Sequence, residues 1–158
     1  MDIREAALSD VGSISDLLQE LVASGQRAGR TSANFVRSHY LEHAARLNCF
    51  VAVDVDGKIL GLQSLKLAAD GNPYGTPAGW GIIGTHVRPS AGRRGIGARL
   101  FAITLKSAQH HALPAIEAYI AETNCPALAF YETMGFRDFR WPDGIVCKVR
   151  EVGNSLVS

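Results

Sequence analysis

A glycine- and arginine-rich segment near the middle of the chain has the composition of a phosphate-binding turn. It runs from Val87 to Leu100 and holds Gly92, Gly95 and Gly97 among four arginines. Glycine lets the backbone come close to a ligand, because no Cβ stands in the way. The free N–H groups at the start of a helix attract anions, and nearby guanidinium groups add charge-assisted hydrogen bonds. The segment therefore predicts a pyrophosphate site.

Two other phosphate motifs fit this chain less well. The dinucleotide-binding pattern G-x-G-x-x-G requires a third glycine, and Leu100 stands in that position. The nucleotide hydrolase loop requires Ser or Thr after Gly-Lys, but Ile59 follows Gly57 and Lys58. The alternative to a phosphate site is a glycine-rich turn whose arginines are solvated.

A second segment combines a polar helix start, an aromatic pair and a glycine stop. Asn124 precedes a short helix predicted over residues 126–134, and Gly135 can end that helix in the left-handed conformation. Phe130 and Tyr131 lie near the end of this helix. Such a pair is often part of a hydrophobic core, which is the alternative to a functional role.

The rest of the chain predicts alternating strands and helices that can position these two segments. A hairpin signal at Asp56 and Gly57 joins two β-rich runs. The predicted strands cover residues 3–7, 50–55, 59–67, 80–87 and 116–121, with 136–139 and 145–149 closing the sheet.

The helices are predicted from apolar spacing and capping residues. The first begins at Ser9 or Asp10, and the second begins at Thr31 or Ser32 and has apolar positions as far as residue 47. A third covers residues 96–109. Because no linker or repeat interrupts the pattern, we predict one mixed α/β domain over residues 1–158.

The composition is that of an ordinary globular protein, with 47% hydrophobic and 20% charged residues. The net charge of +1 lacks the basic excess of a nucleic-acid-binding protein. No apolar run is long enough to span a bilayer, and no signal-peptide pattern follows Met1. The three cysteines are odd in number and far apart. We therefore expect a cytoplasmic protein with neither a nucleic-acid nor a membrane partner.

Together, the two segments resemble the GNAT superfamily of N-acetyltransferases. That family shows V-x-P, then a Gly-x-Gly turn, and later N-x-x-A-x-x-F-Y-x-x-x-G-F; here these are residues 87–89, 95–97 and 124–136. One departure is Gly92, which stands where the family usually has Arg or Gln, and Arg93 follows it. The resemblance covers almost the whole chain. It implies a mixed, mostly antiparallel, twisted sheet of about six to seven strands flanked by about four helices.

The resemblance also implies acetyl-CoA as the acyl donor. Backbone N–H groups near three residues of the fourth strand would bind the pantetheine arm and polarise the thioester carbonyl. The turn would hold the diphosphate, and Asn124 would lie near the pantetheine amides. The implied cofactor-binding residues are Thr85, His86, Val87, Arg93, Arg94, Gly95, Ile96, Gly97, Ala98, Asn124 and Tyr131.

The implied reaction is direct attack of an amine on the thioester. Tyr131 matches the family's general acid, since a phenol with a pKa of about 10 is protonated at neutral pH and can donate to a thiolate. We rank Glu117 first as general base, because the alternation of side chains along a strand places it on the same face as Tyr119. Glu122, His86 and a water relay are alternatives.

The acceptor is expected to be a primary amine of a small or amino-acid-like molecule. Three loops, residues 25–32, 68–79 and 140–144, should set its identity, and Arg27 or Arg30 can hold a carboxylate. The alternatives are an acyl-CoA-binding module without catalysis, a longer acyl-CoA, and a protein N-terminus or an antibiotic as acceptor. We expect no metal site, and a homodimer that pairs through the apolar-rich residues 145–152.

Overall fold

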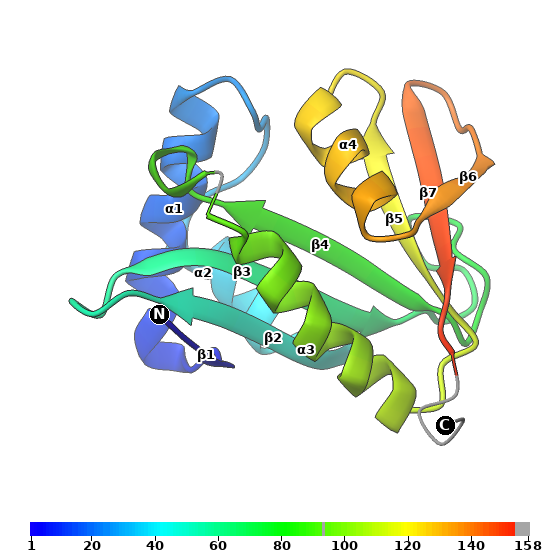
Figure 1. The fold of residues 1–158 in the computed structure, drawn as a ribbon, viewed down its shortest axis with the longest axis horizontal. Helices are drawn as coiled ribbons and strands as arrows, with labels where there is room; N and C mark the ends of the chain where they lie inside the picture. Colours follow the sequence, from blue (N-terminus) through cyan, green and yellow to red (C-terminus); the bar gives the residue numbers. More distant parts are fainter. Residues whose placement is uncertain (93, 154–158) are drawn as a thin grey trace.

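The computed structural model describes residues 1–92 and 94–153, which fold around one seven-stranded sheet (Figure 1). The strand order is β1-β2-β3-β4-β5-β7-β6. All neighbouring strands are antiparallel except β4 and β5, which run parallel. The strands are β1 (Asp2–Glu5), β2 (Arg46–Val53), β3 (Ile59–Leu67), β4 (Gly81–Val87), β5 (Ala115–Ala121), β6 (Arg137–Arg140) and β7 (Ile145–Glu151).

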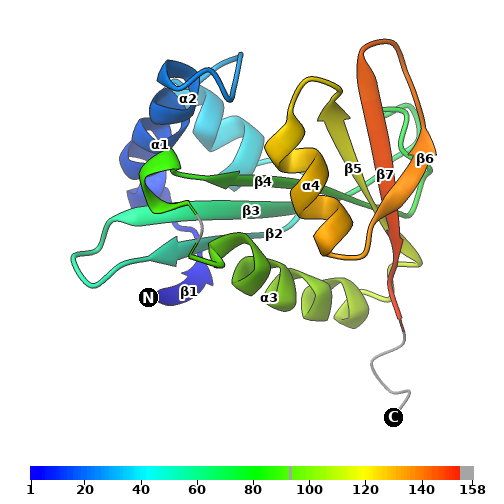
Figure 2. The ribbon, with the colours of Figure 1, turned by 45° about the horizontal axis from the view of Figure 1, so that its top comes forward.

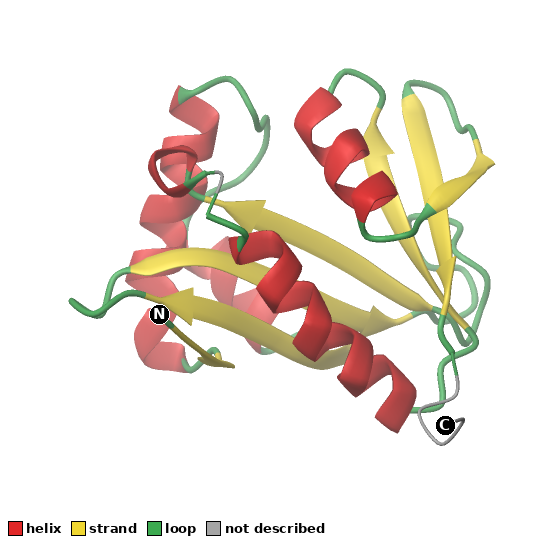
Figure 3. Cartoon of the chain, viewed as in Figure 1, coloured by secondary structure: helices red, strands yellow, loops and turns green. Residues whose placement is uncertain are grey.

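Helices cover both faces of the sheet (Figure 3). The α-helices are α1 (Val11–Ala23), α2 (Ala33–Val36), α3 (Ile96–His110) and α4 (Cys125–Thr133), with short turns η1 (Leu8–Asp10), η2 (Arg37–Leu41) and η3 (Pro89–Ala91). Figure 1 shows α3 and α4 in front of the sheet and α2 behind it. No helix in the described part of the chain is both long and apolar enough to cross a membrane.

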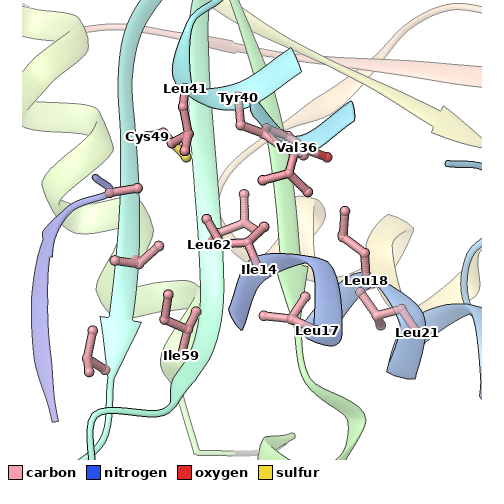
Figure 4. Close-up of a cluster of buried hydrophobic side chains, with 13 residues drawn as sticks. Ile14, Leu17, Leu18, Leu21, Val36, Tyr40, Leu41, Cys49, Ile59 and Leu62 are labelled. Carbon is pink, nitrogen blue, oxygen red and sulfur yellow. The ribbon is translucent and has the colours of Figure 1, made fainter. Parts of the chain in front are cut away.

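A buried apolar cluster joins α1 to the sheet (Figure 4). Ile14, Leu17 and Leu18 are fully buried and recur at helical spacing, so they share one face of α1. They pack with Ile59 and Leu62 of β3 in the same cluster. This packing fixes α1 against the strand that neighbours β4.

The strands β4 and β5 separate along their length. Their pairing joins residues 81–83 of β4 to residues 116–118 of β5 and ends there. Beyond Ile83 and Ala118 the two strands point apart, and α4 lies between their far ends (Figures 1 and 2). The backbone of residues 84–87 is therefore unpaired on the side that faces β5.

The predicted strands match the observed ones, but the second helix is shorter than predicted. Ser32 caps α2, since its Oγ accepts from the Phe35 N–H at 3.1 Å. After α2 and η2 the chain leaves the helix, and β2 begins at Arg46, which pairs with Lys66. Pairing of β2 with the sheet from residue 46 onward therefore replaces the predicted extension of the second helix to residue 47. The spacing of apolar residues does not reveal such pairing.

The start of α1 also differs from the prediction that Ser9 or Asp10 begins this helix. The Asp10 side chain does not cap α1; it pairs with Arg4 at 2.8 Å and accepts from the Ala7 N–H at 2.8 Å. This contact ties β1 to the start of α1.

Candidate active site

A pocket of about 480 Å³ lies where β4 and β5 diverge. Its walls come from β4, from the turn and first residues of α3, and from α4. Many of the residues predicted to bind the cofactor line it: Thr85, His86, Val87, Gly95, Ile96, Gly97, Ala98, Asn124 and Tyr131. The structure therefore brings the two sequence segments together around one space.

Three predicted site residues stand apart from this lining. Arg94 is exposed and Glu117 is buried, and neither is among the residues that line the pocket. Arg93 lies outside the described residues. The pocket also includes Leu21 and Gln26, which no sequence pattern singled out because they come from the end of α1 and the turn after it.

Arg88 anchors the turn before α3 to β3 and to α1. Its Nε donates to the Ile59 carbonyl at 2.6 Å, and its Nη1 pairs with Glu20 at 3.0 Å. Glu20 also accepts from the Ser90 N–H at 3.1 Å. Gly95 then takes φ +71° as the N-cap residue of α3, a conformation that favours glycine. Arg88 thus supports the turn from inside the protein.

The structure gives Gly97 a reason to be glycine that the sequence did not predict. We expected its missing side chain to admit a ligand. A Cβ at this position would lie 2.7 Å from Cε1 of Phe130 in α4. The glycine therefore permits the close packing of α3 on α4 that forms one wall of the pocket.

A chain of three polar side chains ends at the Tyr131 hydroxyl. Gln63 Nε2 donates to Thr85 Oγ1 at 3.0 Å, and Thr85 Oγ1 lies 2.8 Å from Tyr131 Oη. If Thr85 accepts from Gln63 and donates to Tyr131, the Tyr131 proton is free to point into the pocket. Burial raises the pKa of Tyr131, so the phenol is protonated at neutral pH.

Glu117 is fully buried, and its carboxylate already has a hydrogen-bond donor and a cation as partners. It accepts from Thr76 Oγ1 at 2.8 Å and pairs with Arg140 at 2.6 Å. A proton taken up by Glu117 would weaken both contacts. We therefore assign Glu117 a structural role, joining β5 to β6 and to the loop before β4, and do not retain it as the base.

A second pocket, of about 220 Å³, shares one lining residue with the first, His86. His86 Nε2 lies 3.1 Å from Tyr40 Oη, and burial lowers the His86 pKa to about 3, so the imidazole is neutral. The lining includes Arg27, His39, Tyr40, Lys66, Tyr74 and Tyr119. Two of the loops predicted to contact an acceptor, residues 25–32 and 68–79, thus supply side chains to this space.

Arg30 and a pair of histidines at the end of α3 lie outside both pockets. His110 and His111 are at the end of α3, and over residues 1–92 and 94–153 no group of three or more His, Cys, Asp or Glu is placed to hold a metal ion. Arg30 is exposed, and its carbonyl accepts from Arg27 at 2.9 Å.

Comparison with known proteins shows to which family this chain belongs. Residues 14–136 match the model of the Acetyltransferase (GNAT) family. The chain belongs to the GNAT family. The diverging β4 and β5, and the glycine turn that opens α3, are thus features of a GNAT domain in this chain.

Individual relatives agree with this assignment. A mycothiol acetyltransferase from Thermomonospora curvata is 37% identical over 81 residues, which cover 51% of this chain and 25% of that protein. The match thus spans about a quarter of the relative's length. A GCN5-related N-acetyltransferase from Kribbella flavida has a TM-score of 0.79 at 23% identity, covering 95% of this chain and 96% of that one. The yncA protein of Salmonella typhimurium, solved with acetyl-CoA, has a TM-score of 0.72 at 16% identity, covering 99% and 96%. The two solved structures show the same fold.

Proposed function

We propose that this protein transfers an acetyl group from acetyl-CoA to the primary amine of a small acceptor by direct attack. The observation that carries the proposal is that His86 lines two pockets, one beside the glycine turn and Tyr131 and the other beside β3 and η2. Two substrates entering these pockets would meet at the open end of β4. Family membership and the likeness to an acetyl-CoA complex support acetyl-CoA as the donor.

The residues of the larger pocket fit such a donor. Gly95 and Ile96 begin a 15-residue helix, and the structure describes no side chain that caps its first turn. Its N–H groups are therefore available to a diphosphate. The edge of β4 beyond Ile83 has backbone groups for the pantetheine amides. The Asn124 oxygen already accepts from the Ala127 N–H at 3.2 Å, which leaves the Asn124 amide hydrogens for a ligand carbonyl.

Acetyl-CoA would supply the activated acetyl group, and this chain's residues would handle the protons. The acceptor ammonium first loses one proton to water. The amine nitrogen then forms a bond to the thioester carbon, and the bond from that carbon to sulfur breaks. Tyr131 gives its proton to the departing thiolate and regains one from the attacking nitrogen through Thr85 or water. One proton in total leaves for solvent.

The main alternative is a CoA-binding module without catalysis. Calorimetry with CoA tests binding, and a panel of amines with acetyl-CoA, followed by free thiol and product mass, tests transfer. Binding with thiol release and an acetylated product supports the proposal. Binding without transfer to any amine would favour the binding module, and absence of CoA binding would refute both. Repeating the panel with propionyl-CoA and hexanoyl-CoA defines the acyl group, and including a peptide and an aminoglycoside covers the other acceptor classes.

A further inference from the structure

Lys66 is a buried cation that lacks an acidic partner. Its side chain, on β3, is 6% exposed and lines the 220 Å³ pocket. Within residues 1–92 and 94–153, no carboxylate oxygen lies within 4.0 Å of its ammonium nitrogen. Both ring nitrogens of His39 are 3.4 Å away. Burial of a charged group is unfavourable unless the charge is paired.

Several other buried or half-buried cations of the protein have such partners. Lys148, also almost fully buried, contacts Asp138 and Glu132. Arg88 is paired with Glu20 at 3.0 Å, and Arg140 with Glu117 at 2.6 Å. The isolation of Lys66 is therefore not the general pattern of this protein, and it occurs inside a pocket.

Arg27 adds a second cation to the same pocket. Its guanidinium stacks 5.7 Å from the Phe35 ring centroid, and its Nη2 donates to the Arg30 carbonyl at 2.9 Å. Its Nε is buried and finds no acceptor among the described residues. The described lining of this pocket contains no Asp or Glu, and Glu117, on β5, is paired with Arg140.

We propose that Lys66 and Arg27 bind a carboxylate of the acceptor, so that the substrate carries a carboxylate as well as the amine that is acetylated. This inference rests on the proposed function and names the substrate class of the same site. An ammonium alone would be repelled by the two cations, whereas an amino acid brings the negative charge that they lack. The pocket is smaller than the about 300–1,000 Å³ of common ligand sites, which suits an amino acid or the amino-acid end of a larger molecule.

The electrostatics of the surrounding groups agree with this assignment. Burial lowers the Lys66 pKa to about 8, so the amine is mostly charged at neutral pH. Burial and then the charge of Lys66 lower the His39 pKa to about 4, so His39 stays neutral. Burial and the same lysine also lower the pKa of His43. A bound carboxylate would offset the repulsion that these groups feel.

Matched pairs of acceptors test the proposal. The probes are glycine, L-alanine, L-phenylalanine, β-alanine and 4-aminobutyrate, each with its carboxamide and acetyl-CoA. They are assayed with the wild type, Lys66→Met, and the control Lys58→Met, which removes an exposed lysine outside both pockets. For at least one pair, we expect kcat/KM to favour the acid by about 10- to 100-fold in the wild type and control. Lys66→Met should abolish most of that preference.

The same pairs separate this proposal from acetylation of protein N-termini, because a carboxamide resembles the first residue of a peptide. Equal rates for every acid and its amide, or faster rates for the amides, would overturn the carboxylate assignment. Either result would leave acetyl transfer itself established. A preference for acids that survives in Lys66→Met would also overturn the role of Lys66.

A binding measurement decides the question if none of these amines is acetylated. The His39 imidazole resonances are followed by NMR in CoA-saturated protein with N-acetyl-β-alanine or its carboxamide, and calorimetry reports CoA binding separately. We expect the acid, but not the amide, to raise the His39 pKa in the wild type, with no effect in Lys66→Met. No change with the acid overturns the carboxylate site, whereas failure to bind CoA refutes the proposed function.

Discussion

Replacing Lys66 by Met should stabilise the unliganded protein. Lys66 is 6% exposed and has no carboxylate partner among the described residues, so folding removes its charge from water without compensation. The pKa falls from 10.5 to about 8. At about 1.4 kcal/mol per unit of pKa, this difference makes the charged lysine cost up to about 3 kcal/mol, the upper bound being reached without solvent screening. Methionine keeps most of the length of the side chain and removes the charge.

The sign of the pH dependence follows from proton binding. Between about pH 8 and pH 10.5 the unfolded chain holds the Lys66 proton more tightly than the folded chain, so wild-type stability gains with pH in this window. The advantage of Lys66→Met should therefore be up to about 3 kcal/mol at neutral pH and shrink to about 1 kcal/mol near pH 10. Urea unfolding of both proteins between these pH values measures it.

Other groups that face Lys66 are present in both proteins, and the two histidines whose pKa values Lys66 lowers, His39 and His43, are mostly neutral from pH 7 upward with or without it. Burial raises the pKa values of Tyr40 and Cys49 to about 12 and also raises that of Tyr74. Burial lowers the pKa values of His39 and His43. Arg27 and Tyr119 line the same pocket and are likewise unchanged.

Lys58→Met is the matched control, since Lys58 is exposed in the β2–β3 hairpin. Its difference from the wild type should be small and independent of pH. The reasoning is refuted if Lys66→Met is less stable than the wild type at neutral pH, or if the gap between them does not change with pH. Either result would mean that the buried charge is already compensated inside the protein.

The remaining predictions concern the proton donor, the helix contact and assembly. Tyr131→Phe should lower kcat by about 10²–10⁴-fold while CoA affinity, measured by calorimetry, is kept; a donor with a better thiolate leaving group should lose less, and unchanged rates would make Tyr131 a packing residue. Thr85→Val should lower kcat by about 10-fold with the KM for acetyl-CoA unchanged, since it removes the hydroxyl that contacts Tyr131 and Gln63 and keeps the backbone of β4; a change in KM alone would contradict this role. Gly97→Ala should cost about 1–3 kcal/mol in urea unfolding and weaken CoA binding, and adding Phe130→Leu should restore part of both, because the new Cβ meets that ring; no recovery would place the strain elsewhere. We also expect a homodimer through the edge strand β6, where Trp141 is 65% exposed, so light scattering should show Trp141→Lys shifted to monomer; a wild-type monomer would remove the prediction.

Much of the fold could be predicted from local patterns. The β3 strand was placed correctly at residues 59–67, because alternation and the turn at Asp56 and Gly57 are local signals. The convergence of the glycine turn with Tyr131 was also predictable, but only through the family resemblance. Spacing alone left Tyr131 open as a core residue.

Whether an individual charged residue is buried or exposed could not be predicted. Arg88 and Arg94 belong to the same basic segment, yet Arg88 is buried against Glu20 and Arg94 is exposed. Lys66 looks like an ordinary solvent-facing strand residue, and only the packing of η2 and the loop before β4 encloses it. The position of β7 in the sheet could not be predicted either: this strand, expected to pair two copies, lies between β5 and β6 rather than at an edge. These properties depend on contacts between distant segments.

The position of His86 between two pockets has a consequence for how the enzyme can diversify. One pocket is bounded by α3 and α4, and the other by η2, β3 and the loop before β4; they share β4 and the turn after α1, which supplies Gln26 to one and Arg27 to the other. Under the proposed function, substitutions at Lys66 or Tyr74 can therefore change which acceptor is chosen while the donor pocket stays intact. Donor recognition and acceptor choice would then evolve separately, with an altered acceptor range reachable through the second pocket alone.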